Sequence, residues 1–594
     1  MTTRVHRAQG GANLERNGVV RFRLWAPGVE SVCVLLNEAG ALLPMKKLPG
    51  GWYELLTGEA RPGTLYQYVL PDGRRVPDPA SRFQPRDVHG PSEVIDPGGY
   101  EWTENWSGRN WEDLVLYELH IGAFTEDGTF LAAIEKLDHL VALGVTAIEI
   151  MPVADFPGRR NWGYDGVLLY APDSSYGRPE NLKALVEAAH ARSIAVLLDV
   201  VYNHFGPDGN YLPAYAPAFF TDTHHTPWGA AINYDYDDCR PVREFVINNA
   251  LYWLEEFDLD GLRLDAVHAI VDESEKHLLD ELAERARAFA GRPIHLLLEN
   301  EDNDARRLKR EGCAVTLYTA QWNDDLHHVL HTTATRECFG YYADYEGRTD
   351  FLAKALAEGF AYQGEMMSYR GSPRGEPSAF LPPGAFVAFI QNHDQIGNRA
   401  FGERLGMIAP ANVMRALSAI YLLLPQTPMI FMGEEWGARQ PFPFFCDFDN
   451  DLADAIRDGR RQEFARFPEF ADPRQRERIP DPLAEATFRS AKLDWDLVDA
   501  SHIARYRDLI SVRRREIAPL LKQIKCGGES VVHGDGAVDV RWSAGLGEVL
   551  ALSANLSKAH IEFPAAAGRV IWSEGDTGIV FGPWSVRWCV ETTR

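Results

Sequence analysis

Three carboxylates stand at the ends of three short apolar runs in this 594-residue chain. Asp265 lies in Gly-Leu-Arg-Leu-Asp-Ala-Val (261–267), Glu299 closes Ile-His-Leu-Leu-Leu-Glu (294–299), and Asp394 closes Phe-Ile-Gln-Asn-His-Asp (389–394). A short apolar run predicts a buried strand, and a charge at its end is costly unless it is paired or used. Three such ends far apart in the sequence predict one acidic site at one rim of a barrel.

The first two carboxylates predict different roles in catalysis. Side chains alternate between the faces of a strand, so Arg263 and Asp265 share one face, toward the barrel interior, while Leu262 and Leu264 pack under the helices. Arg263 favours the ionised form of Asp265, which a nucleophile needs. Three leucines before Glu299 predict a partly desolvated carboxyl, whose protonated form suits a general acid. Such a pair of carboxyls is typical of glycoside hydrolysis. A separation of about 5–5.5 Å between the two carboxyls implies that the configuration at the reacting carbon is retained.

A fourth acid, Asp199, ends the apolar strand of Leu-Leu-Asp-Val-Val-Tyr-Asn-His (197–204). Asn203 and His204 follow it in the same loop, and Asp394, with its neighbour His393, is expected to hydrogen-bond sugar hydroxyls. Taken singly, a strand-end acid is more often a cap or salt bridge, and a lone histidine is more often structural. For Asp199 we favour pairing with Arg263 over direct chemistry. The co-occurrence of these segments, in order, on the third, fourth, fifth and seventh predicted strands favours a site.

The elements that must position these residues alternate between strand and helix from about residue 112. Apolar strands are expected at 114–120, 146–153, 194–202, 259–267, 293–299, 314–321, 385–393 and 427–432, with helical patterns at 130–143, 179–192 and 241–257. Eight such repeats predict an α/β fold, a (β/α)₈ TIM barrel with insertions. A doubly wound sheet is the alternative, disfavoured because no Gly-x-Gly-x-x-Gly follows an early strand.

The regions on either side of the barrel show alternating β patterns. Val20–Trp25 alternates apolar and charged residues as a half-buried strand does, and a Pro-rich stretch at 77–97 is expected to be a linker. Near the other end, Asp535-Gly536 predicts a hairpin turn before the alternating strand at 538–542. We therefore expect an N-terminal β-sandwich at 1–96, a catalytic barrel at 97–520 and a C-terminal all-β domain at 521–594.

The composition, 45% apolar, indicates a globular protein, and 60 basic against 85 acidic residues give a net charge of −25. This charge disfavours nucleic acid and anionic membranes as partners; it fits a neutral or cationic ligand, or simply a soluble acidic surface. The seven scattered cysteines contain no Cys-x-x-Cys, which argues against a disulfide framework or a zinc site. The start lacks the apolar core of a signal peptide and no run reaches the ~18 residues of a membrane span, so a cytoplasmic location is predicted.

At these residues the chain resembles the α-amylase family of glycoside hydrolases. Residues 199–204, 261–265 and 392–394 are similar to its signature segments, and Glu299 matches the acid on the fifth strand. The resemblance implies retaining α-glucan chemistry in which Asp265 is the nucleophile, Glu299 the acid/base and Asp394 the stabiliser of the transition state. It also implies that the reacting sugar is held by Arg263, His204, His393 and Tyr164. For Tyr164 alone, in Asn-Trp-Gly-Tyr-Asp-Gly (161–166), packing in the core is an equal alternative.

Within that family, the insert segments at 225–233, 321–328, 391–399 and 432–438 are similar to those of members that act on maltooligosyl trehalose. The resemblance implies hydrolysis of the α-1,4 bond next to the terminal trehalose unit. Trp228, Trp322 and His268 are candidates for the trehalose side, although indole rings are as often core. Glu301 is a rival to Glu299, since it has the same strand parity.

The sequence predicts no bound metal, and it leaves alternatives for the function and the assembly. Asn203 matches a residue that binds calcium in many amylases. A calcium site needs about six oxygens, and the sequence around Asn203 does not supply them, so no metal and no cofactor are predicted. The alternatives for function are a glucan-branching transferase or other α-1,4-glucan hydrolase of the same fold and, third, an inactive glucan-binding protein. The expected assembly is a monomer or a homodimer.

Overall fold

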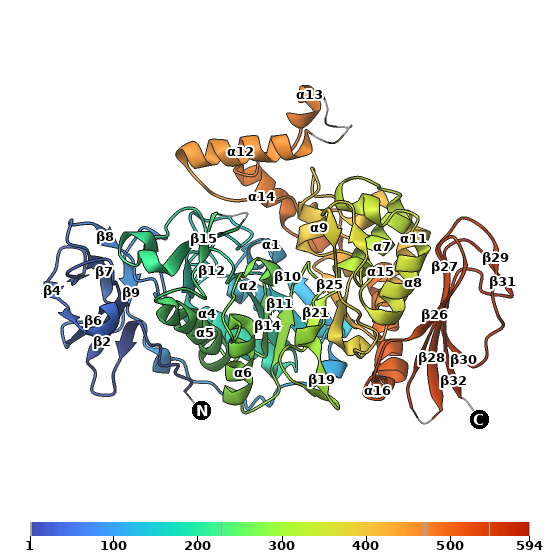
Figure 1. Cartoon of the computed structure of the whole chain (residues 1–594), viewed down its shortest axis with the longest axis horizontal. Helices are drawn as coiled ribbons and strands as arrows, with labels where there is room; N and C mark the ends of the chain where they lie inside the picture. The colour runs from blue at the N-terminus through green and yellow to red at the C-terminus, as the bar shows by residue number, and fades with distance from the viewer. Residues whose placement is uncertain are drawn as a thin grey trace.

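The chain builds a closed barrel of eight parallel strands that lies between two β domains (Figure 1). This computed structural model describes residues 3–226, 229–465, 467, 470, 472–545 and 547–592. Each barrel strand pairs in parallel with its two neighbours, and β25 pairs back to β10 to close the ring. In order around the barrel, the strands are β10 (Leu116–Leu119), β11 (Ala147–Ile150), β14 (Ala195–Val200), β17 (Gly261–Leu264), β18 (His295–Leu298), β21 (Ala320–Trp322), β24 (Phe386–Ala388) and β25 (Thr427–Phe431).

The expected barrel is therefore confirmed, and the doubly wound alternative is excluded by its closure. One strand begins later than expected. Within the range 314–321, β20 (Ala314–Val315) pairs with β19 (Arg310–Glu311) in a small hairpin, and only β21 enters the barrel. Gly312 makes the turn of that hairpin with a φ of 63°, a conformation that favours glycine.

The alternation of side chains along the barrel strands follows the expected pattern. Leu262 and Leu264 of β17 pack in the large core shared with the surrounding helices. Leu297, one strand further on, belongs to a separate apolar cluster with Leu197 and Trp322. Inward-facing positions of neighbouring strands meet in layers inside such a barrel. In the layer nearest the carboxyl ends of the strands, Asp199 stands beside Arg263 in the strand register.

Helices cover the outside of the barrel, with one difference from the sequence pattern. The helical stretch expected at 130–143 is two helices that meet at Glu135 and Lys136, and Gly144 ends the second in the left-handed region, with φ 103°, as a C-cap glycine does. The helices are α1 (Ile121–Phe124), α2 (Phe130–Ile134), α3 (Leu137–Leu143), α4 (Pro179–Ala191), α5 (Cys239–Glu256), α6 (Leu278–Phe289), α7 (Asp324–Thr335), α8 (Thr349–Glu358), α9 (His393–Gly397), α10 (Leu405–Ile408), α11 (Ala411–Tyr421), α12 (Asn450–Phe464), α13 (Pro473–Arg476), α14 (Glu485–Ala491), α15 (Ala500–Val512) and α16 (Ala518–Leu521).

The N-terminal region is a sandwich of two antiparallel sheets, as expected. The segment at 77–97 is packed rather than loose, because Arg82 is buried and pairs with Glu256 at the end of α5. One sheet contains β1 (Gly11–Leu14), β2 (Val20–Trp25), β6 (Trp52–Thr57) and β5 (Lys46–Lys47); the other contains β4 (Leu42–Pro44), β3 (Cys33–Leu36), β7 (Leu65–Val69), β8 (Arg75–Val76) and β9 (Ser92–Glu93).

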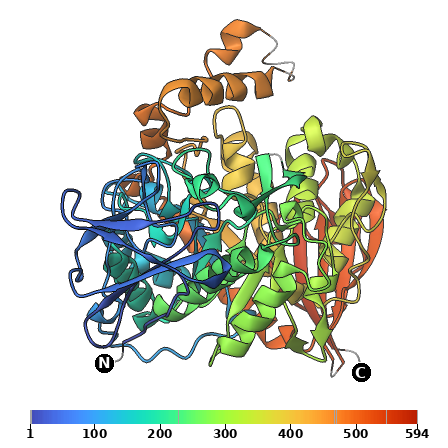
Figure 2. The ribbon, with the colours of Figure 1, turned by 60° about the vertical axis from the view of Figure 1, so that its left-hand side comes forward.

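The C-terminal region is the expected all-β domain, and it lies on the other side of the barrel from the sandwich (Figure 2). Gly536 makes the hairpin turn between β26 and β27 with φ 65°. The domain boundaries at residues 96 and 520 remain predictions. The main sheet contains β26 (Glu529–Gly534), β27 (Ala537–Ser543), β28 (Glu548–Asn555), β32 (Ser585–Thr592) and β30 (Arg569–Glu574), beside the pair β29 (Ile561–Glu562) and β31 (Val580–Phe581).

One insertion projects away from the body of the molecule. Helices α12 and α13 lie above the carboxyl-terminal side of the barrel in both ribbon views (Figures 1 and 2).

Two antiparallel hairpins extend the loops after the second and third barrel strands: β12 (Ala154–Asp155) with β13 (Leu168–Pro172), and β15 (Phe220–Thr226) with β16 (Gly229–Ile232). No helix in the described part of the chain is both long and apolar enough to span a membrane.

Candidate active site

A single buried arginine contacts three of the strand-end carboxylates. The Nη1 atom of Arg263 lies 2.6 Å from Asp199 Oδ2 and 2.9 Å from Asp265 Oδ1, and its Nη2 atom lies 2.8 Å from Glu299 Oε2. Arg263 is fully buried. The structure thus brings Asp265 and Glu299 to the same guanidinium, on two adjacent strands. Nη1 donates a hydrogen bond to Asp265, whereas the Nη2 contact with Glu299 is an ion pair without hydrogen-bond geometry. The planar guanidinium thus attracts both carboxyls to the same group.

Two further groups orient the pair. Asn203 donates from Nδ2 to both the backbone oxygen and Oδ2 of Asp265, each at 2.8 Å. The backbone N–H of Ala266 donates to Glu299 Oε2 at 2.8 Å. Ala266 adopts φ 41°, in the left-handed region, which is uncommon for a non-glycine residue and is often found at functional sites. This strained residue, directly after Asp265, places its amide on Glu299.

Asp394 reaches the site from the start of α9, with a side chain that is 38% exposed. Its neighbour His393 is buried and its Nδ1 atom lies 2.5 Å from Glu118 Oε1 of the first barrel strand. Burial opposes the charged form of His393, but Glu118 and Asp394 outweigh it and raise its pKa to about 9. At neutral pH His393 is therefore an imidazolium, 3.6 Å from Asp394 Oδ1 through Nε2. Asn392 caps α9 through its side chain and so fixes this pair.

Tyr164 and His204 form one wall of the site. The Tyr164 hydroxyl donates to Asp199 Oδ2 at 2.7 Å, and its ring stacks on His393 with centroids 5.0 Å apart. The Nε2 atom of His204 lies 2.9 Å from the backbone oxygen of Tyr164. Burial raises the pKa of Asp199 to about 7, although Arg263 pulls it down. Tyr164 and His204, from the loops after the second and third barrel strands, thus meet beside Asp199.

The trehalose-side candidates are placed differently from one another. Trp322 is 1% exposed and its ring lies under Arg263, 4.0 Å from the guanidinium carbon. It offers no free face for a sugar, because it is covered by the arginine that it supports. His268 is partly exposed and lies 3.6 Å from Glu301 Oε2, whose side chain is half exposed. Arg263 therefore contacts Glu299, whereas Glu301 contacts His268. Trp228 lies outside the described residues.

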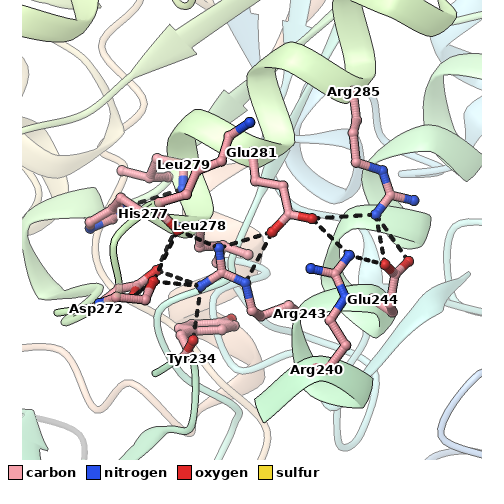
Figure 3. A network of polar contacts seen from close by, with 12 residues as sticks. Tyr234, Arg240, Arg243, Glu244, Asp272, His277, Leu278, Leu279, Glu281 and Arg285 are labelled. Atoms are coloured by element: carbon pink, nitrogen blue, oxygen red, sulfur yellow. Dashed lines mark hydrogen bonds and ion pairs between the residues drawn. The ribbon is translucent and has the colours of Figure 1, made fainter. Parts of the chain in front are cut away.

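The loop between Asp265 and α6 is fastened to the neighbouring helix α5 (Figure 3). Arg243 of α5 lies 2.7 Å from Asp272 Oδ2 through Nη1 and 2.9 Å from Glu281 Oε2 through Nη2. It also donates to the backbone oxygens of Tyr234 and Lys276. Arg243 is buried and the side chain of Asp272 is covered, so this network is little screened by salt. It holds the second half of the loop, residues 272–276, where the chain passes from His268 into α6.

Three acidic residues of the site were not anticipated from the sequence. Glu118 of β10 holds His393. Glu149 of β11 is buried, and neither of its carboxyl oxygens has a partner among the described residues; burial raises its pKa strongly. Asp324 opens α7, and burial, with Glu299 and Asp394 nearby, raises its pKa strongly. A charged residue inside an apolar barrel strand was the available signal for the first two, and the acidic Gln-Trp-Asn-Asp-Asp segment (321–325) was the signal for the third.

A pocket of about 400 Å³ adjoins the helix that carries Asp394. Gln395 and Asn398 line it on one side, and Phe464 and Phe467 of the projecting insertion line it on another. Tyr341 and Phe401 are among its further aromatic walls. Pockets of 300–1,000 Å³ with aromatic walls and a few polar groups are typical ligand sites. Among the described residues, no group of three or more His, Cys, Asp or Glu side chains is arranged to hold a metal ion.

Comparison with known proteins agrees with this geometry. Residues 102–216 match the model for the alpha amylase catalytic domain, and residues 527–588 match a domain of unknown function, DUF3459. A malto-oligosyltrehalose trehalohydrolase of Deinococcus radiodurans is 43% identical over 96% of this chain and 94% of its own length. One from Saccharolobus solfataricus is 42% identical over 85% of this chain and 86% of its own length. The chain belongs to the malto-oligosyltrehalose trehalohydrolase family.

Membership in this family makes the chain a glycoside hydrolase of the α-amylase type. A crystal structure described as a putative alpha amylase from Salmonella typhimurium covers 99% of this chain and 100% of that one, with 45% identity and a TM-score of 0.94. A 1,4-alpha-glucan branching enzyme of Saccharophagus degradans is 32% identical, but only over 45% of this chain. The similarity to the branching enzyme is therefore partial, whereas the similarity to the trehalohydrolases extends along nearly the whole molecule.

Proposed function

We propose that this chain hydrolyses the α-1,4-glucosidic bond next to the terminal trehalose unit of a maltooligosyl trehalose, releases free trehalose and retains the configuration at the reacting carbon. The observation that carries the chemistry is the contact of Asp265 and Glu299 with one guanidinium, that of Arg263. Retaining enzymes need their two carboxyls close together. The choice of substrate rests on the relatives, which bear that name along nearly their full length.

Two displacements at the same carbon describe the proposed reaction. Asp265 attacks the anomeric carbon while Glu299 gives its proton to the oxygen of the departing trehalose, so that the carbon–oxygen bond breaks and a glycosyl ester forms. Glu299, now a carboxylate, then takes a proton from water, whose oxygen displaces Asp265 and completes the hydrolysis. Asp199 and Asn203 hold Arg263 and Asp265 in place throughout.

The other side chains bind the sugar that is attacked. Asp394 and the imidazolium of His393 offer an acceptor and a donor to its hydroxyls, and the ring of Tyr164 offers a stacking surface. The aromatic pocket beside α9 suits the glucan chain that continues from this sugar, because aromatic faces and a few polar groups fit a sugar ring well. His268, on the loop after Asp265, remains the candidate on the trehalose side.

Product analysis tests the proposal. Incubation of the purified chain with maltotriosyl trehalose is expected to release trehalose and maltotriose, with a kcat/KM well above that for a plain maltooligosaccharide of the same length. Equal rates on both substrates argue for a general α-1,4-glucan hydrolase. New α-1,6 branches in amylose argue for the transferase, and no reaction on any of these glucans argues for a binding protein.

A further inference from the structure

A second, larger cavity lies outside the catalytic site, between the loop after the last barrel strand and helices α10, α11 and α15. Its volume is about 810 Å³, twice that of the pocket beside α9. Its lining contains Arg404 and the segment Trp436–Gln440, and none of the three proposed catalytic carboxylates. The volume is within the range of small-molecule sites.

The lining is rich in cations, in contrast to the acidic chain as a whole. It contains four arginines and one histidine against two carboxylates, those of Glu434 and Asp499, whereas the whole chain has a net charge of −25. Both carboxylates already have donors. Glu434 accepts from Tyr421, Tyr506 and Gln391, and Asp499 caps α15. Asp499 also lies 3.4 Å from His502 Nδ1, and neither acid forms an ion pair with Arg404 or Arg439.

Two of the arginines have a carboxylate partner among the described residues and two do not. Arg415 and Arg505 share the carboxylate of Glu574 from the C-terminal domain. Arg439 is exposed and has no ion pair or hydrogen bond with any residue that the structure describes. Arg404 and Arg439 are thus the two arginines of this cavity without a carboxylate partner in the described part of the chain.

Arg404 is a buried cation in this cavity. It is 2% exposed, and it has no carboxylate partner in the described part of the chain. Its Nε and Nη1 atoms donate to the backbone oxygens of Gln440 and Met432, but its Nη2 atom has no partner. Burial lowers its pKa to about 10. A buried charge without a counter-charge is destabilising, and an anion in the cavity would supply one.

A second buried donor lines the same space. Trp436 is 2% exposed, and its indole N–H has no hydrogen-bond partner among the described residues. Met407, Met414 and Leu497 add apolar walls to the cavity. The indole N–H of Trp436 and the free Nη2 atom of Arg404 are donors suited to phosphate oxygens. The apolar walls and the volume fit an organic group attached to that phosphate.

We propose that this cavity, built around Arg404, Arg439 and Trp436, binds a small phosphate-bearing ligand: a sugar monophosphate or free phosphate. One lining residue, Gln391, lies on the segment that precedes Asp394. Gln391 donates to Glu434 in the cavity wall and accepts from the backbone of Leu405, and it stands three positions before Asp394. A ligand there therefore rests on the segment that leads into α9.

Calorimetry on the full-length protein tests the proposal, with hexose 6-phosphate, inorganic phosphate and the uncharged hexose as probes. We expect saturable heat from at least one phosphate-bearing probe, none from the hexose, and weaker binding at higher salt. Tighter binding of the ester identifies a sugar phosphate as the ligand, and equal or tighter binding of inorganic phosphate identifies free phosphate. If neither hexose 6-phosphate nor inorganic phosphate gives binding heat at millimolar concentration, the proposal is overturned.

Variants locate the binding. Arg439→Gln is expected to weaken binding about tenfold, as loss of a charge-assisted hydrogen bond does. Arg16→Gln, a change to an exposed arginine of the N-terminal sandwich, is the matched control and is expected to leave binding unchanged. In crystals soaked with tungstate, the anomalous signal is expected beside Arg404. Unaltered affinity in Arg439→Gln, or tungstate bound only outside this cavity, contradicts the assignment; activity without phosphate is measured separately, so the outcome does not depend on the proposed reaction.

Discussion

The guanidinium of Arg263 lies 2.8 Å from the carboxyl of Glu299, on the neighbouring barrel strand. The same group also contacts Asp199 and Asp265, and it rests on the ring of Trp322. The position of the proposed acid relative to the proposed nucleophile therefore depends on a residue that touches both. This dependence leads to the first prediction.

Arg263→Lys is expected to reduce kcat by about 100-fold or more, with a smaller effect on KM. A lysine keeps the charge, but a single ammonium cannot reach carboxylates on two sides as a planar guanidinium does, and misplacement of a catalytic group by about 1 Å can cost 10²-fold. Steady-state kinetics on maltotriosyl trehalose measure the effect, with Arg16→Lys as the control. A kcat close to that of the unaltered protein contradicts the positioning role.

The two proposed catalytic carboxyls are expected to respond differently to the leaving group. Asp265→Asn removes the nucleophile and is expected to lower kcat by about 10³-fold or more on every substrate. Glu299→Gln removes the proton donor, so the loss is expected to be large on maltotriosyl trehalose and small for the first step on an α-maltosyl fluoride, whose leaving group needs no proton. Pre-steady-state fluoride release measures that step. An equal loss on both substrates contradicts the role assigned to Glu299.

Stability is expected to fall at alkaline pH as His393 loses its proton. Its pKa is raised from the ordinary 6.5 to about 9 in the folded protein, so its contribution is fully present below pH 6.5 and is lost as pH rises through about 9. The contribution is roughly 3 kcal/mol at most.

Melting temperatures between pH 6 and 10 measure this loss. His393→Gln is expected to flatten the profile over that window, whereas His502→Gln, at a half-exposed position, is expected to leave it unchanged. Parallel profiles for all three proteins contradict the assignment.

Asp324→Asn is expected to stabilise the protein and to lower its activity. The side chain has one weak hydrogen bond, from Gln395 at 3.4 Å, and it lies among the carboxyls of Glu299 and Asp394, which raise its pKa together with burial. By contrast, its neighbour Asp325 is held by Arg374, Tyr345 and Asn303. A buried carboxyl that destabilises the fold and makes few structural contacts, as Asp324 does, is typical of a functional site.

Thermal melts and kinetics test this trade. We expect a higher midpoint and a kcat/KM about tenfold lower for Asp324→Asn. Asp302→Asn, at an exposed position whose partner is Arg370, is the control. A lower midpoint with unchanged kcat/KM contradicts the prediction.

The sequence by itself determined the barrel and the strand ends that carry Asp265, Glu299 and Asp394. These features depend on local information. Apolar runs of strand length and the alternation of side chains place Arg263 and Asp265 on the inner face wherever the strand is packed. The small β domains were predictable for the same reason, from alternating patterns and turn residues such as Gly536.

The pairing of Asp199 with Arg263 was expected from the sequence and is confirmed, but only the tertiary structure decided several other contacts. Glu118 and His393 are 275 positions apart, yet they form two hydrogen bonds because the last barrel strands return beside the first. Trp322 is covered by Arg263, which lies across its ring. The residues of the strand that contains Trp322 do not indicate this contact. The cavity around Arg404 likewise exists only where α10, α11 and α15 pack against the loop after β25. Contacts between distant segments follow from the closure of the barrel, and a linear sequence carries no local signal for them.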